Sequence, residues 1–265
     1  MKKRNLSKDT LHDPTHSCTM IRKYERQLSS VFQMWKKDVI KAIQEKQSER
    51  THLDFPFDLD KFLEQLKALA DVRLHPYSDK VIDSVWKEAT QRGIMFGALQ
   101  TKKYGLMVPD HITPDDWDAI KGFSTKGKTG VRGVSDDINK KIIYEISDAI
   151  KEGRNIDRDL IQSISDIVGK GTDSALRIAR TEVMDGVNTG AVKRYVEAGV
   201  EKLEWLTVLD EKACIRDLEV PSGDIYAGCD ELDGVVFDIG EAPKCPIHPQ
   251  CRCTLIPFIE AEEEE

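Results

Sequence analysis

The 265-residue sequence lacks any uncharged apolar run of about 18 residues, the length that a membrane-spanning helix requires. Its first 18 residues carry basic side chains but no apolar core, so we expect no secretory signal peptide. Aromatic residues make up only 7% of the chain, yet hydrophobic residues reach 40%, which suffices for a buried core. We therefore expect a soluble chain of one large or two modest domains, with no membrane partner.

Basic residues are outnumbered, 39 Lys and Arg against 47 Asp and Glu, and the net charge of −8 is unevenly distributed along the chain. Residues 1–50 contain 12 Lys and Arg against 6 acidic residues, whereas residues 201–265 contain 5 against 17. Because nucleic-acid phosphates are neutralised by Lys and Arg, any contact with nucleic acid is expected near the N-terminus. A solvated basic helix face explains the same residues. The acidic end of the chain, residues 259–265, is expected to be a frayed tail.

Cysteine is rare, but its placement is informative. Of six cysteines, Cys18 stands alone, and the other five lie between residues 214 and 253 together with His248. In a chain without a secretory signal, such a cluster favours a metal site over disulfides. Buried free thiols and disulfides are the alternatives that remain.

The cluster offers more ligands than a tetrahedral zinc ion needs, which is four nitrogen or sulfur atoms. The candidates are Cys214, Cys229, Cys245, His248, Cys251 and Cys253. The most economical set takes Cys214 and Cys229 from one arm and His248 and Cys251 from the other. Cys253 is the main substitute, and Cys245 is the first to leave out. A complete Cys/His set leaves no open coordination position, so we expect a structural zinc ion.

Apolar spacing predicts that the first two-thirds of the chain is helical. Residues 18–50 carry an apolar stripe at helical spacing, and Thr113-Pro114-Asp115-Asp116 has the cap, proline and acids of a helix start. The expected helices cover residues 18–50, 58–73, 78–100, 113 onward, 135–152, 157–168 and 173–198. Residues 122–133 and 169–171 are glycine-rich and are expected to be loops.

Residues 122–129 match the phosphate-binding pattern G-x-x-x-x-G-K-[ST] letter for letter. That site needs a strand before the loop and a helix beginning at the Lys-Thr pair. Here the preceding residues are acidic and helix-like, and the next helix is delayed to Ser135. We therefore expect a mobile basic loop. A nucleotide-driven motor that uses this loop is the least favoured functional hypothesis, after the two given below.

After residue 201 the sequence becomes rich in Gly and Pro and carries three short strand patterns, at residues 203–209, 235–237 and 254–256. The predicted fold class is α+β: a mostly helical N-terminal two-thirds with a small, metal-clipped β unit. The expected divisions are a flexible segment (1–17), a helical region (18–155), a C-terminal domain (156–258) and an acidic tail (259–265). Within the C-terminal domain, helices cover residues 157–198 and a zinc-binding β unit covers residues 201–258. A small unit of this kind buries little apolar surface, and a structural metal compensates for that.

Polar residues on or beside the apolar stripe of the helix at 173–198 are candidates for a structural network that docks the β unit. The network comprises Arg180, Thr181, Glu182, Asn188 and, after the first strand, Asp210. Ordinary surface pairs at i,i+3 and i,i+4 are the alternative. The six histidines are scattered and none pairs with a Ser or Cys nucleophile motif, so no catalytic residue is predicted.

The chain resembles the C-terminal domain of Mu F-like phage head morphogenesis proteins, the minor capsid proteins. The resemblance covers about residues 156–258. It rests on the ordered series of Ala-Arg-Thr-Glu at 179–182, Asn188, Trp205, Asp210, Leu-Asp-Gly at 232–234 and His-Pro-Gln-Cys-Arg-Cys at 248–253. Members of the family commonly carry Cys-x2-Cys after the aspartate, whereas here the second cysteine is displaced to Cys229, and Cys245 is additional.

The resemblance implies a virion protein of a tailed virus or provirus, located in the capsid interior or at the portal vertex after assembly in the host cytoplasm. The implied partners are the portal protein and the major capsid or scaffold protein, with packaged DNA contacted through the basic N-terminal region. Ejection with the genome is one possible fate. The alternative is a zinc-dependent nucleic-acid-processing enzyme or an injected effector that acts in the host.

Overall fold

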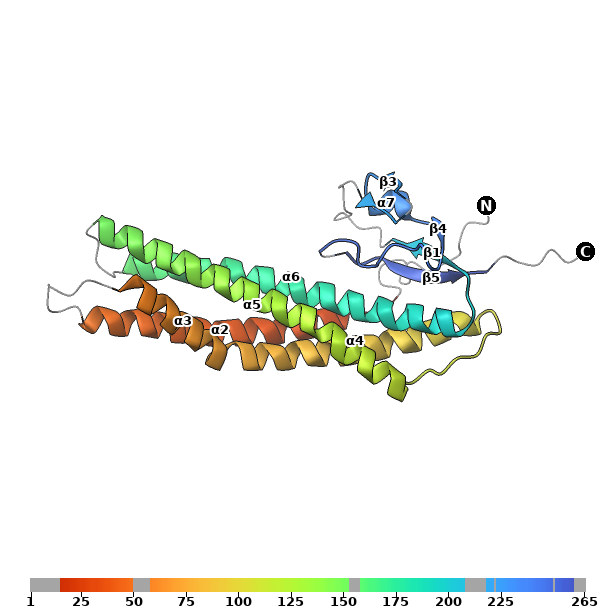
Figure 1. Cartoon of the computed structure of the whole chain (residues 1–265), viewed down its shortest axis with the longest axis horizontal. Coiled ribbons are helices and arrows are strands. Elements are labelled where there is room, and N and C mark those ends of the chain that lie inside the picture. The colour runs from red at the N-terminus through yellow and green to blue at the C-terminus, as the bar shows by residue number, and fades with distance from the viewer. Residues whose placement is uncertain are drawn as a thin grey trace, which may run out of the picture. The chain divides into compact units, whose positions relative to one another are not determined.

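The computed structural model describes residues 15–49, 58–152, 158–207, 218–221, 223–249 and 251–259. Long helices come first, and short strands follow (Figure 1). The helices are α2 (Cys18–Glu49), α3 (Leu59–Arg73), α4 (His75–Lys102), α5 (Pro114–Lys151) and α6 (Arg158–Glu197). They are followed by β1 (Lys202–Leu206), β2 (Leu218–Glu219), β3 (Ile225–Tyr226), α7 (Cys229–Leu232), β4 (Val236–Asp238) and β5 (Thr254–Phe258). The predicted α+β class is confirmed.

The local signals read from the sequence explain where these helices begin and which face they bury. The Asp58 carboxylate accepts a hydrogen bond from the Lys61 amide (2.9 Å) and caps α3. Helix α5 begins at Pro114, as predicted. The apolar stripe of α2 is buried along its length, because residues three and four apart share one face.

Two expected loops are helical instead. Helix α5 runs without a break through residues 122–133, and α6 runs through residues 169–171. The physical reason is visible at Gly171, where an added Cβ would lie 2.3 Å from Ile138 Cδ1. At this position the missing side chain serves the close approach of α5 and α6, so the glycine here reflects packing rather than a chain break. The phosphate-binding pattern therefore lies within a helix and forms no phosphate-cradling loop.

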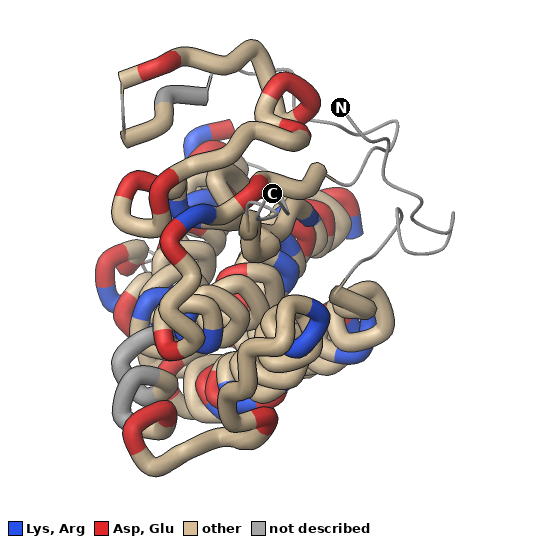
Figure 2. The backbone as a smooth tube through the Cα atoms, turned by 90° about the vertical axis from the view of Figure 1, so that its right-hand side faces the viewer, with Lys and Arg blue, Asp and Glu red and all other residues tan. Residues whose placement is uncertain are grey.

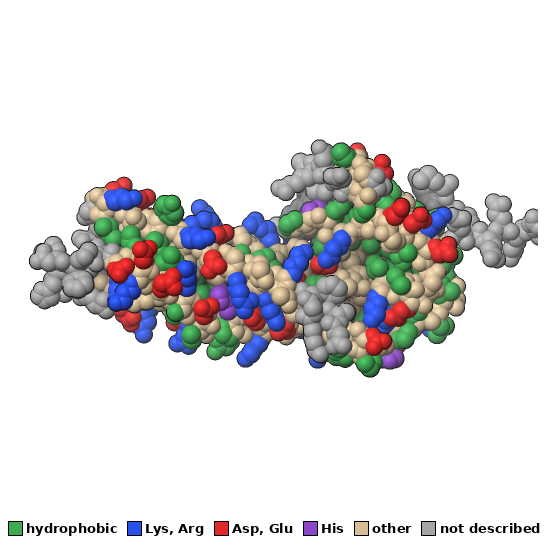
Figure 3. Space-filling model, in the orientation of Figure 1, with side chains coloured by type: hydrophobic (Ala, Val, Ile, Leu, Met, Phe, Trp, Pro, Cys, Tyr) green, Lys and Arg blue, Asp and Glu red, His purple; other side chains and the backbone are tan. Residues whose placement is uncertain are grey.

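The chain divides into two compact units, each of which draws on several helices. Unit 2 comprises residues 23–83 and 124–179, and its helices pack around side chains such as Leu28, Phe32 and Trp35. Within it, the Arg132 guanidinium on α5 forms a bidentate ion pair with Asp79 on α4, with N–O distances of 3.1 and 2.6 Å. Charged side chains of both signs cover its outward surface (Figure 3).

Unit 1 comprises residues up to 22, residues 84–123 and the chain from residue 180 onward. Its α4 and α6 segments come into backbone contact through glycines. A Cβ added at Gly190 would lie 2.4 Å from the Thr90 carbonyl oxygen, and one at Gly93 would lie 2.0 Å from that of Val187. Small residues at i and i+4 on both helices (Gly93 and Gly97, Gly186 and Gly190) allow this approach.

The strands of unit 1 form an antiparallel three-stranded sheet in the order β4-β1-β5, and β2 and β3 form a separate hairpin. The sheet covers an apolar cluster that includes Phe96, Tyr195, Trp205 and the four described cysteines of this region. Predicted strands therefore exist at all three expected places, although residues 208 and 209 lie outside the described residues. The acidic bias of this part is visible as red segments of the tube in Figure 2.

Candidate metal centre

Three cysteines meet beneath the sheet. Cys229 is the first residue of α7, and Cys251 and Cys253 immediately precede β5. Their sulfur atoms lie within 4.8 Å of one another, and each residue is at most 3% exposed. Three thiol groups held this closely and away from water can hold a metal ion as thiolates.

His248 lies beside one of these cysteines and is the candidate for a fourth ligand. Its Nε2 lies 3.1 Å from the Cys229 sulfur, and its Nδ1 lies 2.8 Å from the Pro249 carbonyl oxygen. A carbonyl oxygen only accepts, so the ring donates from Nδ1 and presents the Nε2 lone pair towards the cysteines. This is the tautomer that a histidine needs to bind a metal through Nε2.

The sequence around the cluster fixes the positions of both arms. The Thr207 hydroxyl, which follows β1, donates to the Cys229 carbonyl (2.6 Å), and the Thr207 amide donates to the Asp233 carboxylate (2.8 Å). On the other arm, the Asn188 side chain on α6 donates to the Cys253 carbonyl (3.2 Å). It also accepts from the Thr254 hydroxyl (2.7 Å) and the Leu255 amide (3.3 Å).

The four sulfur atoms differ in their environments. Side-chain hydrogen bonding with Cys229, Cys245 and Cys253 lowers the pKa of the Cys251 thiol and outweighs the opposing effect of burial. Burial is the largest cause that raises the pKa of the Cys245 thiol well above its ordinary value. The Cys245 thiol donates to the Cys253 carbonyl at 2.9 Å.

Of the predicted ligands, Cys229, Cys251 and Cys253 lie within 4.8 Å of one another, and His248 lies beside Cys229. Cys245 also lies at the cluster, and Cys214 lies outside the described residues. All described cysteines of the cluster are free thiols rather than disulfides.

The predicted polar network separates into two sets. Asn188 contacts β5 and the residue before it, as described above. Glu182 is buried and accepts a 2.7 Å hydrogen bond from the Trp86 indole on α4. Arg180 and Thr181 are half-buried on the same helix, and Asp210 lies outside the described residues. The Tyr195 hydroxyl, which was not predicted, donates to the Leu255 carbonyl (3.2 Å) and joins Asn188 at the edge of β5.

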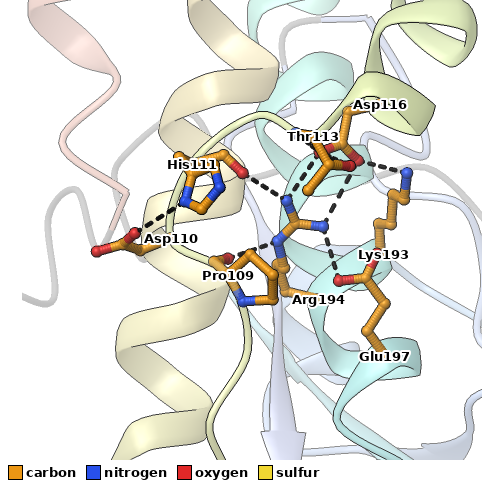
Figure 4. Close-up of polar contacts among 8 residues, drawn as sticks. All are labelled: Pro109, Asp110, His111, Thr113, Asp116, Lys193, Arg194 and Glu197. Carbon is orange, nitrogen blue, oxygen red and sulfur yellow. Dashed lines mark hydrogen bonds and ion pairs between the residues drawn. The ribbon is translucent and has the colours of Figure 1, made fainter.

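Sequence analysis also missed a buried arginine. Arg194 on α6 is fully buried, and it donates to the carbonyls of Pro109 (2.7 Å) and His111 (2.8 Å) in the α4–α5 connection. Its guanidinium pairs with Asp116 (2.8 Å) and Glu197 (2.7 Å), and Lys193 also pairs with Asp116 (Figure 4). Burial alone would raise the pKa of Asp116, but hydrogen bonds from Arg194, Lys193 and Thr113 hold it well below the usual value.

A second unpredicted constellation joins Asp71, His75 and Ser135 in unit 2. His75 Nδ1 lies 2.9 Å from the Asp71 carboxylate, and Nε2 lies 2.9 Å from the Ser135 hydroxyl. However, Ser135 is fully buried and donates its own proton to the Arg132 carbonyl (2.8 Å). A nucleophilic serine must instead give that proton to the histidine and face a substrate. The arrangement is therefore structural.

The comparisons with known proteins place this centre within a matched family region. Residues 140–256 match the sequence model of the family described as Phage Mu protein F like protein, which confirms the resemblance. A curated relative from Haemophilus influenzae, described as an uncharacterized protein, is 22% identical over 157 residues. The alignment covers 57% of this chain and 32% of the relative, so the chain spans about a third of that protein's length. No solved structure matches the chain.

The Mu F-like match points to phage head morphogenesis, and the family is a structural rather than an enzymatic one. None of the described helices has an apolar stretch long enough to cross a bilayer.

Proposed function

We propose that the protein is a minor capsid protein that acts in head assembly of a tailed virus or provirus, at the capsid interior or the portal vertex, without enzymatic activity. The observation that carries this proposal is the Mu F-like match over residues 140–256, whose C-terminal part contains the buried cysteine cluster. Assembly in the host cytoplasm precedes incorporation into the particle, and ejection with the genome is a further step that this role accommodates.

The metal that fits the cluster best is zinc in a structural role. Cys229, His248, Cys251 and Cys253 would supply three sulfur ligands and one imidazole nitrogen, a soft donor set that suits zinc over hard cations. Cys214 is the other candidate for the fourth position. When bound, the metal would tie α7 to the segment that enters β5. Metal-binding energy would then be folding energy for this small unit.

The portal protein and the major capsid or scaffold protein are the proposed partners. Exposed apolar side chains support protein contacts, because Met95 and Leu99 on α4 and Met107 after it are 49%, 61% and 78% exposed. Packaged DNA is proposed to contact the basic face of α2, where Arg26, Lys37 and Lys41 are exposed.

The experiment that tests the assembly role is deletion of the gene from an inducible provirus, with complementation in trans. The proposal predicts particles with normal heads and poor infectivity, which the wild-type gene restores. Affinity capture of the tagged protein from assembling cells should recover the portal protein. Unchanged infectivity after deletion would contradict the assembly role.

The second candidate, a zinc-dependent nucleic-acid-processing enzyme or host-acting effector, requires an open metal position. A nuclease screen of the metal-loaded protein beside Asp210→Ala and His248→Ala variants distinguishes the two functions. Cleavage that both substitutions abolish would favour the enzyme.

A further inference from the structure

The metal cluster contains one thiol more than the proposed ligand set needs. Cys245 is 3% exposed, and its sulfur donates to a backbone carbonyl, that of Cys253. It is also within hydrogen-bonding contact of the sulfur of Cys251, one of the proposed ligands. Cys245 therefore lies beside a proposed metal-binding sulfur without belonging to the ligand set, and its thiol is placed for another reaction.

We propose that Cys245 is a resolving thiol that forms a disulfide with Cys251 when hydrogen peroxide oxidises the cluster, and that this modification releases the metal. The inference rests on the metal site proposed above and assigns a role to the one cysteine of the described cluster that the four-ligand set leaves out.

The reaction balances in two steps. The Cys251 sulfur attacks the peroxide O–O bond and becomes a sulfenic acid, while the other peroxide oxygen leaves as hydroxide and takes up a proton to form water. The Cys245 sulfur then attacks the Cys251 sulfur, and an S–S bond forms while the sulfenic hydroxyl leaves with the thiol proton as water. Two thiols are oxidised and one peroxide is reduced to two waters. Cys251 is then no longer a thiolate, so the site loses one of its ligands.

The segment that carries Cys245 lies at the edge of a cavity and is held in place by an ion pair. The residues on both sides of Cys245 border an open cavity of about 500 Å³, lined by Val220, Pro221, Pro243, Lys244, Pro246 and Ile247. The segment is held in place from the other side, since the Lys244 ammonium lies 2.8 Å from the buried Asp185 carboxylate on α6.

The partner of Cys245 follows from the same contacts. Cys245 meets Cys253 through the backbone carbonyl of that residue, whereas it meets Cys251 through the sulfur atom. Disulfide exchange requires sulfur-to-sulfur approach, so the predicted bridge is Cys245–Cys251.

The test uses the full chain loaded with zinc and treated with hydrogen peroxide. A chromogenic chelator measures released zinc, and differential alkylation with peptide mass spectrometry maps the disulfides. We expect the wild-type chain to lose its one zinc equivalent, to gain the Cys245–Cys251 bridge, and to rebind zinc fully after reduction. The matched control, Cys18→Ser, removes the cysteine outside the cluster and should behave as wild type.

Cys245→Ser should bind zinc as wild type before oxidation. After oxidation it should pass to the sulfinic acid at Cys251 and fail to recover zinc binding when reduced. A bridge between any other pair of cysteines, or full recovery of zinc binding by oxidised Cys245→Ser, would overturn the proposal. If that variant does not fold, disulfide mapping of the wild-type chain decides alone. A wild-type chain that binds no zinc refutes the metal site, while disulfide mapping still tests the role of Cys245.

Discussion

The buried arginine of unit 1 gives a prediction whose size follows from its contacts. Arg194→Met keeps most of the aliphatic stem but removes all the donors that reach the Pro109 and His111 carbonyls, Asp116 and Glu197. Asp116, which is 1% exposed, would retain only Lys193 as a cationic partner. Removing one member of a buried ion pair costs about 3–5 kcal/mol, because the other charge is left without compensation.

A matched surface pair provides the control. Lys67 and Glu64 on α3 form an i,i+3 ion pair at 2.8 Å, with side chains 44% and 71% exposed. Exposed pairs of this kind contribute about 0–1 kcal/mol, so Lys67→Ala should change stability little.

The assay is urea unfolding followed by circular dichroism, with amide hydrogen exchange of residues 103–113 as a local readout. Arg194→Met should lower the unfolding midpoint strongly and remove protection in the α4–α5 connection, whereas Lys67→Ala should do neither. If Arg194→Met is no more destabilising than Lys67→Ala, the reasoning about this network is refuted.

Three further predictions follow from the same structure. The pKa of Asp116 lies well below 3.8, so its contribution to stability is present above that pH and is lost as pH falls through the lower folded-state pKa. The stability difference between wild type and Asp116→Asn should therefore narrow as pH falls from about 5 towards about 2, as urea titrations at several pH values would show. Gly169→Ala should stabilise the protein by about 1 kcal/mol, because a Cβ there meets nothing within 4 Å. Gly171→Ala should destabilise it through contact with Ile138. Equal shifts of the two thermal midpoints, or shifts with both signs reversed, would contradict this. Asn188→Ala should lower the free energy of unfolding by about 1–3 kcal/mol and expose the Leu255 amide to hydrogen exchange. The surface control Gln162→Ala loses a hydrogen bond to Asp166 and should leave that amide protected.

The parts of the fold that could be predicted from the sequence are those set by local chemistry. The apolar period of α2 and the proline at the start of α5 each depend on residues within a few turns, and both predictions are confirmed. Glycine was misread as a chain break in α5 and α6 because its role at Gly171 depends on Ile138, a residue on another helix. No local pattern reveals such a contact.

The same distinction holds for the site. Cysteine and histidine spacing predicted a cluster, and the structure places Cys229, Cys251 and Cys253 together. The choice among the candidate ligands depends on the path of the backbone between them, which sequence spacing does not determine. Arg194 was missed because its partners are backbone carbonyls some 80 positions earlier in the sequence. The signal that was available was an arginine within the apolar face of α6, one residue before the buried Tyr195.

The most direct test of the metal-clipped unit is the metal content of the full chain, purified under reducing conditions and measured by elemental analysis and native mass spectrometry. The account predicts one zinc ion per chain in the wild type and in Cys18→Ser, and none in Cys251→Ser. A strong chelator should then unfold the β unit while the helices persist. A wild-type chain without bound transition metal, with the cluster cysteines merely packed or bridged, would contradict it.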